Sequence, residues 1–420
     1  MSDEVLPYRS HQDPMFRTEC LTCGSAALTE IVNLGMHPMA DTFVSPARAS
    51  EADRLYPLVC DLCGMCGQIQ LRAVTRPEER YVEVDYSYTS ANSATSRAHW
   101  AEYARHVSAK VALPAGAMTL EIGSNDGFLS AEFASLGYDV LGVDPSPVMA
   151  AQAQSRGVKT ITALFGATLA RELLPTFARK PHLICANNVF NHSNDPRDFV
   201  SGVRHLLDAG GTFVFELPYW LRSIEQKKFD QVYHEHVTYF TVTYADHLFR
   251  TCDMHIAEVE EVNYHGGSIR VYVRPGAGAA PAESARRLID AEHAAGLFDP
   301  ATYRRFMADV VRSRDRFLAK LYALRAAGSS VVCVGAAAKG NTFLGYYNLD
   351  SSVVDCVTDS SDNKQGKLTP RTRIPIMPDA ELARYESVCA IILAWNISGA
   401  LRENLTRINP GITFLNPYES

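Results

Sequence analysis

Short hydrophobic runs alternate with longer helical stretches from residue 118 onward. The runs MTLEIG, YDVLGVD, VKTI, HLICANN and GTFVFELP are rich in the residues that strands favour, and helical stretches separate them. Strands that alternate with helices are typical of a parallel sheet covered by helices. We therefore expect a doubly wound α/β core over residues 118–217.

Three more runs, VTYFTVT, IAEVEEVNY and SIRVYV, follow with few helical breaks between them. Such consecutive strands predict an antiparallel extension at the edge of the sheet. The segment PGAGAAPAE at 275–283 has the composition of a joint between domains. A helical stretch at about 296–327 then leads into SSVVCVGAAAKGN, VVDCVTDSS, VCAIILAW and ITFLNP. This second strand series predicts a smaller α/β domain.

Composition limits the class of protein. At 420 residues the chain fits two or three domains of about 150 residues each, and 47% hydrophobic with 21% charged residues is typical of a globular protein. Neither an apolar run of about 18 residues nor a leader segment is present, so we expect a cytoplasmic protein without membrane contact. The net charge of −7 comes without a basic block and argues against nucleic acid as the partner.

Five of the ten cysteines fall within the first 66 residues. Cys20 and Cys23 form one CxxC pair, and Cys60, Cys63 and Cys66 offer a second pair in two ways. Four thiolates satisfy the tetrahedral geometry of a structural zinc ion and leave no position for a catalytic water. The residues alone do not decide whether Cys60 or Cys66 is the fourth ligand.

The segment TLEIGSNDGFLS predicts a cofactor loop between a strand and a helix. Its acidic pattern E-x-G-x-x-x-G differs from the GxGxxG of nicotinamide sites and suits a ligand with an ammonium and a sulfonium. Asp144 ends the next strand, 21 residues after Gly123, where its carboxylate can bind ribose hydroxyls. Together these motifs predict S-adenosylmethionine in a Rossmann-like methyltransferase domain. The predicted cofactor residues are Glu121, Gly123, Ser124, Asn125, Asp126, Gly127, Asp144, Pro145, Ser146, Phe165, Asn187 and Asn188.

Two further segments carry candidate chemistry. NNVFNH at 187–192 ends a core strand, which directs Asn188 and His192 toward a substrate. QVYHEHVTYF supplies Tyr233, Glu235 and two histidines. If this segment is extended, His234 and His236 share one face and Glu235 points the other way. No third ligand accompanies the two histidines, which disfavours a second metal site.

The cysteine module, EIGSNDG, ANNVFNH, FELPYW, YHEH, YHGGSIR, VGAAAKGN and TDSSDNKQGKLTP together resemble the sugar C-methyltransferases of branched deoxysugar biosynthesis, over essentially the whole chain. The resemblance implies a zinc-binding domain at 1–80, a methyltransferase domain at 81–280 and a Rossmann-like nucleotide-sugar-binding domain at 281–420. In the family's cysteine pattern a Gln-Leu pair lies four residues after the last ligand. Gln70 and Leu71 occupy that place here, which favours Cys63 and Cys66 over Cys60.

The resemblance also implies a reaction. Family members commonly methylate C3 of a dTDP-4-keto-deoxysugar in natural-product and antibiotic biosynthesis. A carbon next to a ketone loses its proton only to a well-placed base, with the enolate oxygen stabilised. The family's histidine base matches His236, and His234 is a second candidate. The predicted catalytic set is His236, Glu235, Tyr233, His192 and Tyr88.

We expect the C-terminal domain to contribute to substrate binding. Lysines that follow Gly-rich turns there suit a diphosphate. The predicted substrate-binding residues are Tyr86, His265, Lys339, Asn341, Asp359, Lys364 and Lys367. We expect a monomer or a weak homo-oligomer. The residues leave open which sugar and nucleotide bind, and whether C3 or C5 is methylated.

Three other functions compete with this prediction. An O- or N-methyltransferase for a small metabolite would keep the cofactor motifs but needs no enolate-forming base. A zinc-ribbon adaptor without catalysis conflicts with the acidic charge. A dehydrogenase site at VGAAAKGN lacks the GxGxxG pattern.

Overall fold

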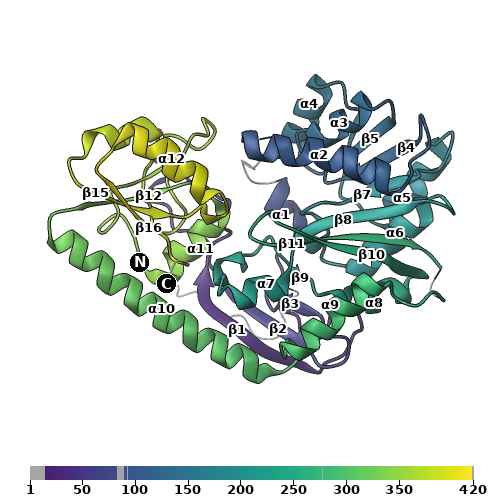
Figure 1. The fold of residues 1–420 in the computed structure, drawn as a ribbon, viewed down its shortest axis with the longest axis horizontal. Coiled ribbons are helices and arrows are strands. Elements are labelled where there is room, and N and C mark those ends of the chain that lie inside the picture. The colour runs from purple at the N-terminus through teal and green to yellow at the C-terminus, as the bar shows by residue number, and fades with distance from the viewer. Residues whose placement is uncertain (1–14, 83–88, 92, 277, 419–420) are drawn as a thin grey trace, which may run out of the picture.

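Three sheets organise the chain in the computed structural model, which describes residues 15–82, 89–91, 93–276 and 278–418. The middle sheet has the strand order β10-β11-β8-β7-β4-β5-β6, and the C-terminal sheet has the order β14-β13-β12-β15-β16. A four-stranded sheet, β1-β2-β3-β9, lies near the N-terminus. In Figure 1 the middle and C-terminal sheets lie to the right and left of the view, with the N-terminal strands β1 and β2 below and between them.

The middle sheet is the expected doubly wound core with an antiparallel edge. The strands β6, β5, β4, β7 and β8 pair in parallel in that order. On the far side of β8, β11 pairs antiparallel with β8 and β10 pairs antiparallel with β11. Two of the covering helices begin in the same way. Pro147 and Pro196 occupy their first turns, and the side chains of the preceding Ser146 and Asp195 cap them. The strands are β4 (Met118–Ile122), β5 (Asp139–Asp144), β6 (Thr160–Thr162), β7 (Leu183–Cys185), β8 (Thr212–Pro218), β10 (Met254–Val262) and β11 (Ser268–Pro275), and the helices are α2 (Ala94–Lys110), α3 (Phe128–Ser135), α4 (Pro147–Ser155), α5 (Ala167–Leu173), α6 (Pro196–Leu206) and α7 (Trp220–Glu225).

The expected strand VTYFTVT is wrong for most of its length. Only β9 (Thr238–Tyr239) is a strand, and it pairs with the N-terminal strand β3 (Ile69–Leu71) instead of the core sheet. The Thr241 side chain accepts a hydrogen bond from the Tyr244 backbone N–H, so the following residues begin the helix α8 (Val242–Thr251). The remaining N-terminal strands are β1 (Leu28–His37) and β2 (Tyr56–Cys63), and the short helix α1 (Pro77–Tyr81) follows β3.

The C-terminal sheet is entirely parallel, as expected for the second strand series. The 27-residue helix α10 (Pro300–Ala326) leads into it along one side of the molecule (Figure 1). Its strands are β12 (Ser330–Val334), β13 (Cys356–Thr358), β14 (Ile376–Met377), β15 (Val388–Ile392) and β16 (Ile412–Leu415), and its helices are α11 (Ala338–Tyr347) and α12 (Ser398–Ile408), while α9 (Glu283–Ala294) precedes α10. None of the helices in the described ranges combines the length and apolarity needed to cross a bilayer.

Candidate active site

The four preferred cysteines come together at the end of the N-terminal sheet. The sulfur atoms of Cys20, Cys23, Cys63 and Cys66 all lie within 4.8 Å of one another, with Cys20–Cys66 at 3.5 Å and Cys23–Cys63 at 3.6 Å. A tetrahedral zinc ion with Zn–S bonds of about 2.3 Å holds its sulfurs about 3.8 Å apart. The thiols therefore fit a zinc ion, while Cys60 is buried in the interior of β2 and is not part of the group.

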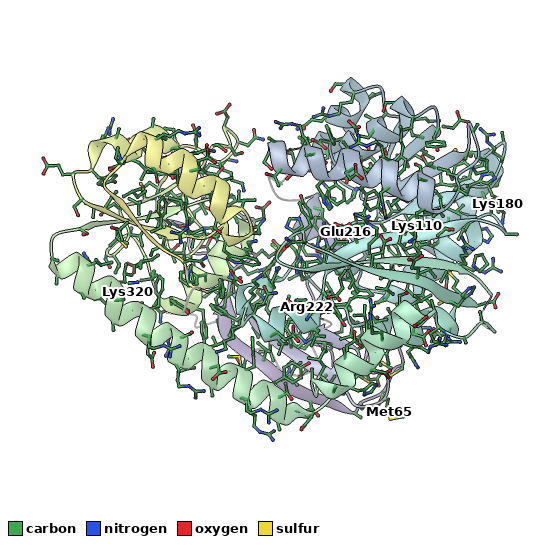
Figure 2. The ribbon with its side chains drawn as sticks, in the orientation of Figure 1. Met65, Lys110, Lys180, Glu216, Arg222 and Lys320 are labelled. Carbon is green, nitrogen blue, oxygen red and sulfur yellow. The ribbon has the colours of Figure 1, made fainter. Side chains whose placement is uncertain are left out.

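Two glycines give the two cysteine pairs the same turn. The Gly24 N–H donates to the Cys20 carbonyl and the Gly67 N–H donates to the Cys63 carbonyl, both at 3.0 Å. Both glycines have a positive φ, 71° and 72°, which only glycine adopts readily. Met65, between the second pair, is 71% exposed and lies at the periphery of the molecule (Figure 2). The equivalent geometry supports Cys63 and Cys66 as the second pair.

The cofactor pocket opens at the carboxyl ends of β5, β4 and β7, where an open α/β sheet places its ligand. Gly123 has φ +70°, and a Cβ there would lie 2.6 Å from the Val189 side chain. The loop therefore requires glycine. Eight predicted cofactor residues line the pocket: Glu121, Gly123, Asn125, Asp144, Pro145, Ser146, Asn187 and Asn188.

The pocket carries unsatisfied donors and buried acids. The side-chain nitrogens of Asn187 and Asn188 are buried and lack a hydrogen-bond partner among the described residues. The Asp144 carboxylate accepts the backbone N–H groups of Asn125 (2.8 Å) and Ser146 (2.9 Å), and burial raises its pKa. Burial also raises the pKa of Glu121 to about 8. A ligand that brings both cationic groups and hydrogen-bond acceptors, such as S-adenosylmethionine, fits this donor set.

Four predicted cofactor residues lie beside the pocket and not in its lining. The Asp126 carboxylate accepts the Ser90 hydroxyl and pairs with Arg156. A Cβ on Gly127 would lie 2.7 Å from Ala153, so this glycine serves packing. The Phe165 ring packs edge-on against that of Phe199. Ser124 follows Gly123 in the cofactor loop.

Contacts between aromatic rings connect His236 to this pocket. The His236 ring stacks on that of His192, which lines the pocket, with 5.3 Å between the ring centres. The tilted ring of Tyr233 lies 4.0 Å away. Its Nδ1 lies 3.1 Å from the Gln231 carbonyl oxygen, which requires a proton on Nδ1 and leaves a lone pair on Nε2. Burial lowers the pKa of His236 to about 3, so the ring is neutral near pH 7.

The expected alternation of the HEH segment is wrong, because the chain turns there. The His236 N–H donates to the Tyr233 carbonyl at 3.0 Å, which closes a turn around His234 and Glu235. The His234 ring faces Tyr56 at 5.6 Å, away from His236. Glu235 accepts the Asp41 backbone N–H at 3.1 Å, and burial with the Asp41 charge raises its pKa to about 7. The orienting contact of His236 comes from Gln231 instead of Glu235.

Some site residues were not predicted. Tyr81 and Trp100 line the cofactor pocket, and the Tyr81 ring stacks on His192 at 5.8 Å. The predicted Tyr86 and Tyr88 lie outside the described residues. No motif in the sequence marks Tyr81 or Trp100.

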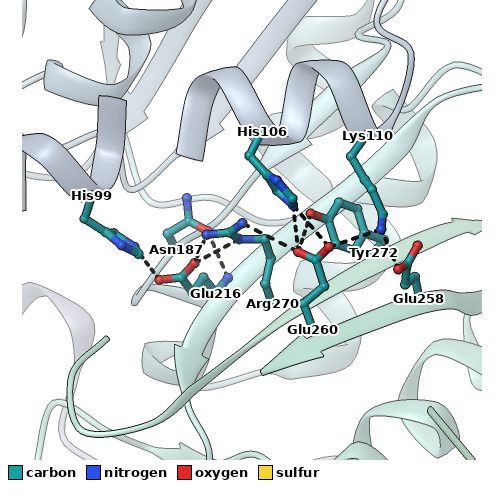
Figure 3. Close-up of polar contacts among 9 residues, drawn as sticks. All are labelled: His99, His106, Lys110, Asn187, Glu216, Glu258, Glu260, Arg270 and Tyr272. Carbon is teal, nitrogen blue, oxygen red and sulfur yellow. Dashed lines mark hydrogen bonds and ion pairs between the residues drawn. The ribbon is translucent and has the colours of Figure 1, made fainter. Parts of the chain in front are cut away.

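A buried polar network connects α2, the helix that carries Trp100, to β8. The Glu216 carboxylate, fully buried on β8, pairs with His99 at 2.6 Å and Arg270 at 2.7 Å. The Glu216 backbone N–H donates to the Asn187 side chain at 2.8 Å (Figure 3). Because His99 and Trp100 belong to α2, this network joins the helix to the pocket floor.

The predicted substrate residues separate into two groups. Asn341 donates to the Ala40 carbonyl, Asp359 accepts the Ala336 and Ser361 backbone N–H groups, and Lys364 donates to the Ala336 carbonyl. These three side chains therefore stabilise the fold. Lys339 and His265 lie closer to the active site, since the Lys339 charge contributes to lowering the pKa of both His265 and His236. Lys367 is half-buried.

Comparisons with known proteins identify the family. Family models match residues 20–81 ("Putative zinc binding domain"), 96–258 ("Methyltransferase domain") and 263–417 ("C-methyltransferase C-terminal domain"). C-methyltransferase NovU of Streptomyces niveus is 29% identical over 387 residues, which cover 92% of this chain and 91% of NovU. The chain is a C-methyltransferase. The predicted family, α/β fold, S-adenosylmethionine dependence and structural zinc are thereby confirmed.

Solved structures resemble parts of this C-methyltransferase. Magnesium protoporphyrin IX methyltransferase of Synechocystis PCC 6803, with bound SAH, has a TM-score of 0.34 and 18% identity and covers 42% of this chain and 83% of its own. The PH0226 protein of Pyrococcus horikoshii OT3 has a TM-score of 0.36 and 19% identity over 45% of this chain and 94% of its own. These likenesses indicate nothing about the substrate of this chain. The domain boundaries and the roles of individual site residues stay predictions.

The zinc ligands can be tested with two neighbouring thiols. We expect the C-methyltransferase to bind about one zinc ion per chain and Cys66→Ser to lose it, because three thiolates no longer close the tetrahedron. Cys60→Ser should retain zinc, since Cys60 is buried in β2 away from the cluster. Metal analysis after dialysis measures both. Zinc loss in Cys60→Ser and retention in Cys66→Ser would assign the ligands the other way.

The role of Asp144 can be tested against an acid of the same strand. Asp144→Asn should weaken S-adenosylmethionine binding by about 10- to 100-fold, because a hydrogen bond to a charged group is lost in a buried pocket. Asp139→Asn is the control, because its exposed carboxylate pairs with Arg179 at the start of β5. Calorimetric titration measures both affinities. Equal affinities in the two variants would contradict a cofactor contact at Asp144.

Burial of neutral His234 makes stability depend on pH. Burial lowers the pKa of His234 from 6.5 to about 4, so between these values the unfolded chain holds a proton that the folded chain lacks. Stability is therefore lost as the pH falls below 6.5. As the pH falls from 7.5 to 5, the free energy of unfolding of His234→Asn should increase by about 2 kcal/mol relative to that of the wild type. Urea unfolding at both values measures the gap, and a gap that does not change would contradict the burial.

Proposed function

We propose that this C-methyltransferase methylates the carbon next to the ketone, C3, of a dTDP-linked 4-keto-deoxysugar, with His236 as the base. The observation that carries the proposal is the His192–His236 stack at 5.3 Å, which joins a proton acceptor to the wall of the cofactor pocket. Methylation at carbon requires such an acceptor, because a C–H bond must give up its proton before the carbon can attack a methyl group.

The state of His236 supports its role as the base. Because Nδ1 donates to the Gln231 carbonyl, Nε2 carries the lone pair and can take the substrate proton. Burial keeps the ring neutral near pH 7, which is the protonation state that a base needs. The same hydrogen bond fixes the direction of the lone pair.

A second group must stabilise the enolate oxygen that forms as the proton leaves. His192 suits this role, because its Nε2 is buried without a hydrogen-bond partner among the described residues and the ring lines the cofactor pocket. Burial lowers the pKa of His192 well below 6.5, so the ring would donate as neutral imidazole. Tyr233, whose ring lies beside that of His236, remains a predicted catalytic residue.

Bound S-adenosylmethionine supplies the electrophilic methyl group. The residues of the chain then have three tasks: Asp144, Asn187 and Asn188 bind the cofactor, His236 removes the proton, and His192 stabilises the enolate. The name of NovU states methyl transfer to carbon, which supports the carbon as the acceptor here.

The two histidines of one turn provide a matched test. The protein is incubated with S-adenosylmethionine and a dTDP-4-keto-6-deoxysugar in deuterium oxide, and mass spectrometry follows deuterium exchange and methylation. His236→Asn should lose both by about 100- to 10,000-fold, the usual contribution of a general base. His234→Asn should retain both, because its ring faces Tyr56. Cofactor binding should be equal in the two variants.

Other results would contradict the proposal in different ways. Exchange and methylation that survive in His236→Asn would remove His236 as the base. A product whose new methyl group lies on an oxygen or a nitrogen would reject transfer to carbon. Absence of both in the wild type with bound cofactor would reject the substrate class.

A further inference from the structure

A buried arginine lies beside the proposed active site. Arg80, in the helix α1, is only 2% exposed, and its Nε is buried without a hydrogen-bond partner among the described residues. No carboxylate in the described ranges forms an ion pair with it, whereas the neighbouring Arg76 pairs with Glu79 at 3.2 Å. A buried charge is costly unless an opposite charge accompanies it. The fold therefore keeps an unbalanced positive charge at this position.

Neutral oxygen atoms hold the guanidinium group of Arg80 in place. One terminal nitrogen donates to the Thr75 carbonyl at 2.8 Å and to the Thr75 hydroxyl at 3.2 Å. The other donates to the His192 carbonyl at 3.1 Å and to the Asn194 side-chain oxygen at 2.6 Å. The Asn194 amide in turn donates to the same Thr75 carbonyl at 2.9 Å. Because these acceptors are uncharged, they fix the position of the guanidinium and do not cancel its charge.

The same contacts connect Arg80 to the wall of the cofactor pocket. Its hydrogen bond to the His192 carbonyl holds the backbone of a residue whose side chain lines that pocket. The guanidinium also lies over the ring of Tyr81, 5.5 Å from its centre, and that ring stacks on His192. Arg80 thus acts on His192 directly through the backbone and indirectly through the Tyr81 ring.

The charge of Arg80 extends to the predicted catalytic groups. Burial is the main cause of the low pKa of His192, and the Arg80 charge lowers that pKa further. Burial raises the pKa of Glu235, and the Arg80 charge acts in the opposite direction. Both effects indicate a positive potential around these two side chains. Because the region is buried, the charge acts more strongly there than it would in water.

The proposed reaction creates a negative charge in this region. The keto sugar carries no charge at its carbonyl group, whereas the enolate that forms when His236 takes the proton carries one on its oxygen. A fixed positive charge stabilises this anion more than it stabilises the ketone, which is the condition for a catalytic effect. His192, the proposed partner of the enolate oxygen, is the residue that Arg80 holds.

We propose that Arg80 is a positioning residue of this reaction: it holds His192 at the pocket wall, and its unpaired charge favours the enolate. The proposal rests on the proposed function for the enolate itself. Arg80 precedes β4, the first strand of the middle sheet. A helix outside the cofactor-binding core therefore contributes to the chemistry.

The test uses the full zinc-loaded chain with S-adenosylmethionine and a dTDP-4-keto-6-deoxysugar in deuterium oxide. Arg80→Met should lower the rates of exchange and methylation at saturating substrate by about 10- to 100-fold, because the enolate loses a positive charge and His192 loses a contact. Arg80→Lys should recover part of this loss, since it keeps the charge without the planar fork. Arg76→Met is the matched control, because its side chain is 62% exposed. Equal S-adenosylmethionine binding in all variants shows that they are folded.

Two results of this assay would overturn the inference and keep the proposed function. One is a rate of exchange in Arg80→Met that equals that of the wild type. The other is an equal loss in Arg80→Lys and Arg80→Met, which would reduce Arg80 to a packing role and remove its charge from the chemistry.

Nitrogen NMR of labelled histidine separates the inference from the proposed function, because it needs no substrate. The His192 signals, assigned by comparison with His192→Asn, should move in Arg80→Met and stay in place in Arg76→Met. Signals that move only in Arg80→Met, with no exchange in the wild type, would support the contact between Arg80 and His192 and reject the proposed function. Signals that stay in place in Arg80→Met would overturn the inference.

Discussion

The hydrogen bond between the Gln231 carbonyl and Nδ1 of His236 is the contact on which the proposed chemistry depends. It selects the tautomer and aims the lone pair of Nε2. The contact survives only if the turn from Tyr233 to His236 keeps its shape. That turn is held from outside the middle domain, because β9 begins two residues later and pairs with β3 of the N-terminal sheet.

The side chain of Gln68 connects the zinc-binding cysteines to the segment that follows this turn. The Gln68 side chain donates to the Thr238 hydroxyl at 3.1 Å and accepts the Thr22 backbone N–H at 3.0 Å. Thr22 lies between two zinc ligands and Thr238 opens β9. A zinc ion bound to these cysteines would therefore stabilise the segment that carries His236.

Periodicity and strand-end motifs were enough to predict the two wound sheets and the cofactor loop. Tertiary contacts decided the rest. Both CxxC pairs of the second cysteine group precede a glycine, so the choice of Cys63 and Cys66 depended on the resemblance to the family's pattern. In the folded chain only Gly67 of the two has the positive φ of Gly24. The HEH segment was expected to be extended, but a turn and the cap at Thr241 determine its course.

The tautomer of His236 is the most direct test of the account. Nitrogen NMR of the protein with labelled histidine, assigned by comparison with His236→Asn, reports the protonation of each ring nitrogen at pH 7. The account predicts a neutral ring with the proton on Nδ1 and a bare Nε2. A proton on Nε2, or a doubly protonated ring, would contradict the assignment of His236 as the base.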